Sequence, residues 1–254
     1  MNAAVDVSLK ENLQSLKLTH MAKELDSAMR QAREAGQDYS EFLLQLTEHE
    51  LRIRSENRLK RRLKEARFPL LKTIEDFDFA FAPELDRRLI RHLCSNEYVK
   101  ERRNVIFLGK SGTGKTHLAT ALGVEACRQG IRTRFASACG LANELIEARN
   151  EKDLQRCLKR YTGYGLLILD ELGYIPFSKE GAELLFQVLT ERHEKGSVII
   201  TSNLGFSDWT QIFGDANLTA ALLDRLTHKA HIVECNWDSY RLQESRKKQE
   251  RNQI

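Results

Sequence analysis

Cysteine, proline and long apolar runs are all scarce in this sequence, and each scarcity excludes something. The 254 residues hold five cysteines, an odd number with no two at CxxC spacing, which argues against a disulfide framework and predicts reduced thiols. Three prolines leave room for long, uninterrupted helices. Apolar runs such as residues 166–169 fall far short of the roughly 20 residues that cross a bilayer, and the N-terminus lacks the apolar stretch of a signal peptide. We therefore expect a cytoplasmic protein that does not engage a membrane.

Charge, in contrast, is abundant but nearly balanced. Hydrophobic residues make up 41% of the chain, enough to form a core, whereas charged residues make up 30% and the net charge is only +4. A case for nucleic-acid binding must therefore rest on where the charge lies. Residues 52–67 are strongly basic, and a helix there would meet several phosphates of a duplex, although a solvated helix face explains the run equally well. The predicted DNA contacts in this stretch are Arg52, Arg54, Arg58, Lys60, Arg61 and Arg62.

The first part of the chain has the apolar spacing of helices. One set of apolar residues recurs at helical spacing until Gly36 interrupts it. A second helix is expected to begin beside Asp38, with Glu41 three residues later completing a capping box. The apolar positions of the first stretch are Leu9, Leu13, Leu16, Leu18, Met21, Leu25 and Met29, and those of the second are Phe42, Leu46, Ile53, Leu59 and Leu63. Together they predict a small all-helical domain.

The helical pattern ends at Arg67-Phe68-Pro69, because the residue before a proline disfavours helix. We place a domain boundary there, with a helical domain at residues 1–67 and a larger domain at residues 68–254. From residue 104 onward, short apolar runs alternate with helical stretches, which predicts an α/β fold with a five-stranded parallel sheet covered on both faces. The predicted strands are residues 105–108, 133–136, 166–169, 198–200 and 232–233.

A glycine-rich segment follows the first of these strands and carries the most specific motif in the chain. Residues 109–116 are Gly-Lys-Ser-Gly-Thr-Gly-Lys-Thr, which matches the P-loop pattern between a strand and a helix. The glycines let backbone N–H groups curl toward phosphates, and the helix N-terminus attracts anions. Lys115 is placed to reach the β- and γ-phosphates of ATP, and Thr116 to bind Mg²⁺. The predicted nucleotide-binding residues are Gly109, Ser111, Gly112, Thr113, Gly114, Lys115, Thr116 and His117.

Two further strands end in polar residues suited to ATP hydrolysis. The strand at 166–169 ends in Asp170 and Glu171. Asp170 suits the Mg²⁺ shell, and Glu171 suits the orientation and polarisation of an attacking water. The strand at 198–200 is followed by Asn203, which is expected to hydrogen-bond the γ-phosphate or that water, because parallel strands end at the same edge of a sheet. Paired carboxylates at this place favour transfer to water over transfer to another acceptor.

Arg225 stands beside Asp224 in a later helical stretch. A surface ion pair between the two is one interpretation. The other is an arginine finger that reaches the ATP of a neighbouring subunit, a device that raises the hydrolysis rate by about 10³- to 10⁵-fold. In that case hydrolysis requires an oligomer.

With these residues in place, the chain resembles the IstB family, the transposition helper ATPases of insertion sequences, whose core is similar to that of the DnaC and DnaI helicase loaders. The resemblance extends over nearly the whole chain, including residues 67–69, 75–79, 109–117, 169–171, 201–203, 224–226 and 238–241. It implies an AAA+ fold with the P-loop strand central, and roles for Glu171 as catalytic glutamate, Asn203 as sensor 1 and Arg225 as arginine finger. It also implies ATP-dependent helical or ring-like homo-oligomers on double-stranded DNA and a partner transposase of the IstA type.

The resemblance also bears on two other regions of the chain. Residues 138–161 would match the helical insertion of initiator-type AAA+ proteins, although a solvated helix face remains an equal alternative. Its candidate DNA contacts are Arg149, Lys152, Arg156, Lys159 and Arg160. The sequence after the last predicted strand is too short for the usual C-terminal helical lid, so that the sensor 2 role has only Arg241 as a nearby candidate.

Two alternative functions stay open on the sequence alone. A helicase loader with the same core would use the helical domain to grip a replicative helicase and would prefer single strands. A P-loop kinase would need a small acceptor and a site to bind it, and the Asp170-Glu171 pair argues against that chemistry.

Overall fold

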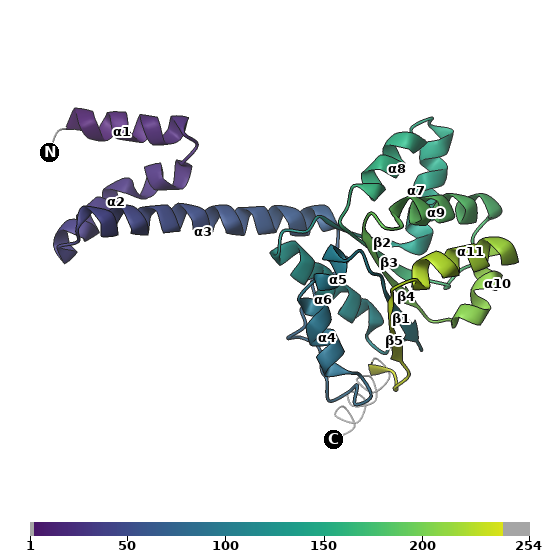
Figure 1. Cartoon of the computed structure of the whole chain (residues 1–254). Helices are drawn as coiled ribbons and strands as arrows, with labels where there is room; N and C mark the ends of the chain where they lie inside the picture. Colours follow the sequence, from purple (N-terminus) through teal and green to yellow (C-terminus); the bar gives the residue numbers. More distant parts are fainter. Residues whose placement is uncertain (1–2, 241–254) are drawn as a thin grey trace, which may run out of the picture. The chain divides into compact units, whose positions relative to one another are not determined.

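The computed structural model describes residues 3–240 and divides into two compact units, one that ends at Arg61 and one that begins at Arg62 (Figure 1). Arg241, the candidate for sensor 2, lies outside the described residues. Among residues 3–240, every helix is too short or too polar to cross a bilayer.

The first unit is built from helices α1 (Ala3–Ser15) and α2 (Thr19–Ala35) and the first part of α3 (Tyr39–Ala66). The sequence predicted one helical stretch before Gly36, and this was wrong. The helix breaks at Lys17, whose φ of 59° places it in the left-handed region, and the Leu18 amide closes the turn by donating to the Leu13 carbonyl at 2.8 Å. Neither glycine nor proline marks this break, so that the apolar spacing runs through it undisturbed.

The other helix boundaries of this unit agree with the sequence. Gly36 ends α2 with a φ of 62°. The expected capping box is formed, since the Glu41 amide donates to Asp38 Oδ1 at 2.8 Å and the Asp38 amide donates to Glu41 Oε2 at 3.2 Å. The helix α3 ends at Ala66, three residues before Pro69.

A buried carboxylate from α3 stands in for the missing cap of α2. Leu18, at the N-cap position of α2, contributes no side-chain hydrogen bond. Instead Glu50, with 3% of its side chain exposed, accepts hydrogen bonds from the amides of His20 at 2.9 Å and Met21 at 2.8 Å and pairs with Arg54 at 2.7 Å. Burial alone would raise the pKa of Glu50, but these donors together lower it. The ionised carboxylate therefore joins α2 to α3.

The second unit contains a five-stranded parallel sheet in the order β2-β3-β4-β1-β5. Its strands are β1 (Val105–Gly109), β2 (Thr133–Ser137), β3 (Leu166–Leu172), β4 (Ser197–Ser202) and β5 (His231–Cys235). All five predicted strands are confirmed, and each is one to three residues longer than predicted. The P-loop strand β1 is interior, between β4 and β5, but β4 occupies the middle position that the family resemblance had given to β1.

Helices cover both faces of this sheet, as Figure 1 shows. Alternate residues of each strand enter opposite cores, so that Ile200 packs under α7 to α11 while its neighbour Ile199 packs under α4 to α6. The helices of this unit are α4 (Arg87–Cys94), α5 (Glu97–Lys100), α6 (Lys115–Arg128), α7 (Ala138–Asn150), α8 (Leu154–Thr162), α9 (Lys179–Arg192), η1 (Phe206–Asp208), α10 (Trp209–Phe213) and α11 (Ala216–Thr227). The structure describes only residues 236–240 after β5, so the predicted absence of a C-terminal lid concerns residues outside the described part of the chain.

Candidate nucleotide site

The loop between β1 and α6 has the backbone of a phosphate cradle. Gly112 and Gly114 have φ values of 82° and 93°, in the region that favours glycine, and Gly114 is the N-cap residue of α6. Between them the backbone turns so that its amides and the N-terminal end of α6 face the same space. The loop therefore offers hydrogen-bond donors to an anion.

Lys115 begins α6 and is folded back over this loop. Its side chain is only 8% exposed, and its Nζ donates to the carbonyls of Gly109 at 2.7 Å and Lys110 at 2.6 Å. A buried ammonium held by main-chain oxygens lies at the right place to meet the phosphates that the loop amides would hold.

Residues from the far end of the described chain hold the loop in place. The Trp237 indole donates to the Thr113 carbonyl at 2.9 Å, and the Tyr240 amide donates to the Gly112 carbonyl at 3.0 Å. At Gly109 a Cβ atom would come within 2.1 Å of the Cys235 carbonyl oxygen, so that only glycine fits there. The cradle is thus a product of β1, α6 and the segment after β5 together.

Two strand ends and the first turn of α6 bring a set of oxygen atoms to the cradle. Thr116 Oγ1 donates to Asp170 Oδ1 at 2.9 Å, and Thr201 Oγ1 donates to the same oxygen at 2.5 Å. Thr201 Oγ1 also accepts from the Glu171 amide at 3.0 Å. Hydroxyl and carboxylate oxygens of this kind are the ligands that Mg²⁺ prefers, so the predicted pair of Thr116 and Asp170 fits the ion. Thr201 was missed as a site residue, although its place at the end of a buried strand pointed to this edge.

Glu171 occupies an irregular position in the sheet. Leu169 pairs with Ile200 and Leu172 with Ser202, so that β3 holds one extra residue relative to β4. At this bulge Glu171 has a φ of 59°, which is uncommon for a residue with a side chain. Its side chain is exposed to the cavity beside the loop, whereas Asp170 before it is 6% exposed. The bulge therefore separates the two carboxylates into a buried one and an accessible one.

A cavity of about 490 Å³ is lined by the loop, Thr116 and Thr201, whereas Asp170, which accepts from both hydroxyls, is not among its lining residues. Of the predicted site residues, Ser111 to His117, Glu171 and Asn203 line it, whereas Gly109 and Asp170 do not. Arg225 is not among its lining residues. The rest of the wall was not predicted from the sequence and is formed by Pro69, Leu70, Lys72, Asp76, Phe77, Asp78, Phe81, Thr120, Tyr174, Thr201, Ser202 and Tyr240.

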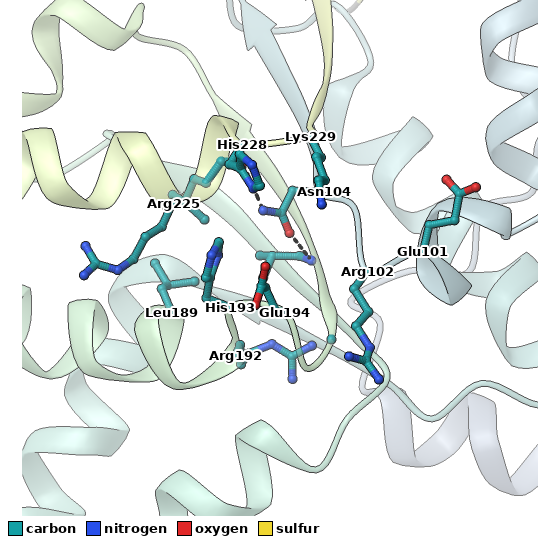
Figure 2. A pocket seen from close by; sticks show the side chains of 13 residues that line it. Glu101, Arg102, Asn104, Leu189, Arg192, His193, Glu194, Arg225, His228 and Lys229 are labelled. Carbon is teal, nitrogen blue, oxygen red and sulfur yellow. Dashed lines mark hydrogen bonds between the residues drawn. The ribbon is translucent and has the colours of Figure 1, made fainter.

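Arg225 lies at the other edge of the sheet. It lines a second cavity, of about 270 Å³, together with residues that precede β1, β4 and β5, among them Asn104 and Lys229. Its guanidinium donates to the Ala221 carbonyl at 2.7 Å, lies 5.5 Å from the centre of the Phe186 ring and is turned away from Asn104 (Figure 2). Because the P-loop lies at the carboxyl edge, Arg225 is on the opposite side from the nucleotide cavity of its own chain.

Some of the predicted DNA contacts already have partners within the chain. Arg54 is tied to Glu50 and to the Lys17 carbonyl, Arg149 pairs with Glu180 at 3.2 Å, and Arg160 pairs with Glu144. Arg52 contacts the ring of His49 at 3.1 Å, and Arg62 is half-buried. Arg61 also interacts within the chain but is exposed, as are Arg58, Lys60, Lys152, Arg156 and Lys159.

Comparison with known proteins agrees with this site. A family model described as "IstB-like ATP binding protein" matches residues 11–248. The chain is 43% identical over 235 residues to an insertion sequence IS21 putative ATP-binding protein of Pseudomonas aeruginosa, covering 92% of this chain and 89% of the relative. It is 38% identical to an IS232 putative ATP-binding protein of Bacillus thuringiensis subsp. berliner, covering 93% and 94%.

Solved structures show the same fold at low sequence identity. AMPPCP-bound DnaA from Aquifex aeolicus superposes with a TM-score of 0.58 at 19% identity, covering 74% of this chain and 57% of that one. DnaI superposes with a TM-score of 0.54 at 19% identity, covering 64% and 90%. The second unit is therefore an AAA+ P-loop fold.

Proposed function

We propose that this chain, which belongs to the IstB-like ATP-binding protein family, is an ATPase that assembles on double-stranded DNA and serves a partner transposase in transposition. The family binds ATP, and one observation carries the step to hydrolysis. Around a single cavity the fold gathers a phosphate cradle with Lys115, the Thr116 hydroxyl, which donates to Asp170 behind it, and the accessible carboxylate of Glu171. In this proposal residues 1–67 contact DNA or a partner, and residues 68–254 hydrolyse ATP and add DNA contacts of their own.

The side chains would divide the chemistry as follows. The loop amides and Lys115 hold the β- and γ-phosphates, while Thr116 and Asp170 hold Mg²⁺. Bound there, Mg²⁺ supplies positive charge to the phosphate oxygens. Glu171 accepts a hydrogen bond from the attacking water and polarises it, and Asn203, exposed at the same edge, donates to the γ-phosphate or to that water.

Arg225 would complete the site of a neighbouring copy. Its position at the amino edge prevents it from serving its own nucleotide, whereas a second copy stacked head to tail would bring it to the carboxyl edge of the first. The arrangement supports an open or closed homo-oligomer whose hydrolysis depends on assembly.

DNA contact would use the exposed cations. Arg58, Lys60 and Arg61 lie on α3, and Lys152, Arg156 and Lys159 lie on or beside α8, which supports two separate phosphate-binding strips. The names of the relatives connect them with insertion sequences, and this supports a transposase as the partner. ATP, DNA and such a partner meet in the cytoplasm.

The decisive experiment uses Glu171→Gln to hold the ATP-bound state. We expect this variant to bind ATP like the wild type, to hydrolyse it about 10²- to 10⁴-fold more slowly, and to accumulate on fluorescent duplex DNA as an ATP-dependent assembly. Affinity for duplex should fall steeply between about 50 and 200 mM salt. Phosphate release from wild type with no acceptor present excludes a kinase. Preference for single strands, with capture of a replicative helicase in place of a transposase, would move the function to helicase loading.

A further inference from the structure

His117, the residue after Thr116, directs its Nε2 at a carbonyl outside the phosphate cradle. Its Nε2 lies 2.8 Å from the carbonyl oxygen of Thr73. Because a carbonyl can only accept, Nε2 must carry the hydrogen of this bond. The ring also packs edge-on against Phe77, with centroids 5.3 Å apart and planes at 85°. Both contacts reach a segment more than 35 residues earlier in the chain.

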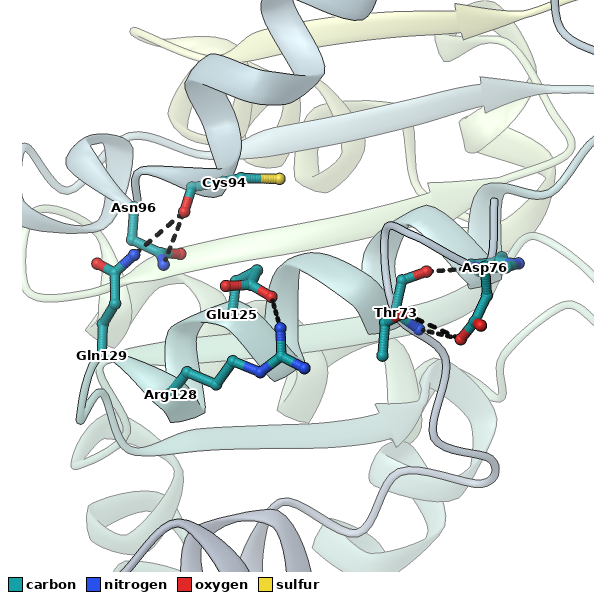
Figure 3. A network of polar contacts seen from close by, with 8 residues as sticks. Thr73, Asp76, Cys94, Asn96, Glu125, Arg128 and Gln129 are labelled. Carbon is teal, nitrogen blue, oxygen red and sulfur yellow. Dashed lines mark hydrogen bonds and ion pairs between the residues drawn. The ribbon is translucent and has the colours of Figure 1, made fainter. Parts of the chain in front are cut away.

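That segment is a compact turn in its own right. The Thr73 amide and hydroxyl both donate to Asp76 Oδ2 at 3.0 Å, as Figure 3 shows. The hydrogen bond from the Thr73 amide is the chief reason that the pKa of Asp76 is lowered, and the nearby His117 contributes. The turn therefore presents the Thr73 carbonyl to α6 as a rigid acceptor.

Phe77 brings the same turn against the phosphate cradle. A Cβ atom on Gly114 would come within 2.8 Å of Phe77 Cε2, so that the ring lies directly on the loop backbone. His117 and Gly114 are three residues apart at the start of α6. Both contact the Phe77 ring, so that the turn is held at two points of α6.

The turn is also a wall of the nucleotide cavity. Lys72, Asp76, Phe77 and Asp78 line it, and beyond them the lining continues through Pro69, Leu70, Phe81 and Tyr240. The Phe81 and Tyr240 rings meet edge-on with centroids 5.0 Å apart. Since the P-loop takes the phosphates, this wall is left for the sugar and base, and its apolar part suits a flat, weakly polar ring.

We propose that His117 is a positioning residue that fixes this wall to the first turn of α6 and thereby sets the affinity for the nucleoside part of ATP. The phosphates are served by Lys115 and Thr116, so the contribution of His117 is confined to the half of the ligand that carries the base. The inference rests on the ATP site of the proposed function, but requires neither DNA nor a transposase.

The test compares two ligands on the full chain by titration calorimetry, Mg²⁺-ATP and Mg²⁺ with inorganic triphosphate, which lacks the nucleoside. His117→Ala should weaken ATP binding about tenfold, the loss of one hydrogen bond and a ring contact, while triphosphate binding changes less than about twofold. His117→Gln, whose amide nitrogen can take the place of Nε2, should recover most of the affinity for ATP. His117→Phe, which keeps a ring against Phe77 but has no donor, should fall between.

Lys115→Ala is the matched control, since it should weaken both ligands together. The proposal is overturned if His117→Ala weakens triphosphate as much as ATP, because the residue would then act on the cradle, or if it weakens neither. Melting temperatures of all variants exclude global unfolding as the cause. If the wild type fails to bind duplex DNA, the proposed function is refuted. The expected effects of His117→Ala on the affinities for ATP and for triphosphate do not change.

Discussion

In the helical unit, five buried apolar side chains surround the contact between α1, α2 and α3, whereas the AAA+ unit buries an apolar layer on each face of its sheet. The small core is supplemented by a polar network, in which Glu50 joins the start of α2 to Arg54 on α3. Small units bury a smaller share of their surface and depend more on such individual contacts. One unit should therefore respond to changes in charge and the other to changes in volume.

The largest effect should come from a residue that supports neither core. Arg225→Ala is expected to lower ATP hydrolysis about 10³-fold or more, while both units keep their melting temperatures. Steady-state phosphate release measures the first effect and calorimetry the second.

An experiment that mixes Arg225→Ala with Glu171→Gln makes this prediction sharper. Arg225→Ala keeps Glu171 and Glu171→Gln keeps Arg225, so mixed assemblies contain some complete sites. Hydrolysis should then rise above that of either variant alone. If mixing restores nothing, Arg225 does not act across copies.

The next effect tests whether the AAA+ unit is sensitive to a change in the volume of a core side chain. Ile199 is fully buried in the central strand β4, and Ile199→Ala should destabilise the AAA+ unit by about 2–5 kcal/mol through the cavity it leaves. Chemical denaturation, monitored by the loss of ATP binding, measures the stability of the AAA+ unit. The unfolding of the helical unit should not shift, and a common shift would show that the two units unfold as one.

A change of charge should act on the helical unit instead. Glu50→Gln conserves the volume but removes the ion that accepts the His20 and Met21 amides, and we expect a loss of about 1–3 kcal/mol. Hydrogen exchange at the start of α2 locates the effect. Leu46→Met, a change in the same core that nearly conserves volume, is the control and should cost less.

The same carboxylate makes the helical unit sensitive to acid. Because the pKa of Glu50 is lowered on folding, its contribution is complete above the unfolded value, about 4.5, and is lost as the pH falls through the folded value. Wild type should therefore lose stability in this unit below about pH 4.5, and Glu50→Gln should show a flatter profile. Identical profiles would show that another group is responsible.

The smallest effect separates two neighbouring arginines. Arg58→Ala should leave stability unchanged, since the side chain is exposed, and should reduce the salt dependence of duplex binding by about one ion. Arg54→Ala should lower stability and leave the salt dependence unchanged, because Arg54 donates hydrogen bonds to Glu50 and to the Lys17 carbonyl. Equal salt slopes for both variants would remove α3 from the DNA interface.

Sequence alone was sufficient where local chemistry determines structure. The P-loop glycines, the strand that carries Asp170 and the capping box at Asp38 each depend on neighbours within a few residues, and each is present. The five strands were also predictable, because short apolar runs in a chain of this composition indicate buried strands.

What could not be predicted depends on contacts between distant residues. Glu50 has the sequence setting of a solvated helix position and is buried by α2, and Arg54 looked like a DNA contact for the same reason. The partner of His117 lies 44 residues away, and the turn that contains it has no periodic pattern. The bulge at Glu171 arises from the pairing of β3 with β4, which no single strand encodes.

The hydrogen bonds from Trp237 and Tyr240 to the P-loop have a consequence for the order of events during synthesis. The cradle residues leave the ribosome more than 100 residues before the groups that brace them. A nascent chain that ends before Trp237 has the complete motif but lacks its brace, so it should not yet retain ATP. We therefore expect a nascent chain to bind ATP only after β5 has joined the sheet.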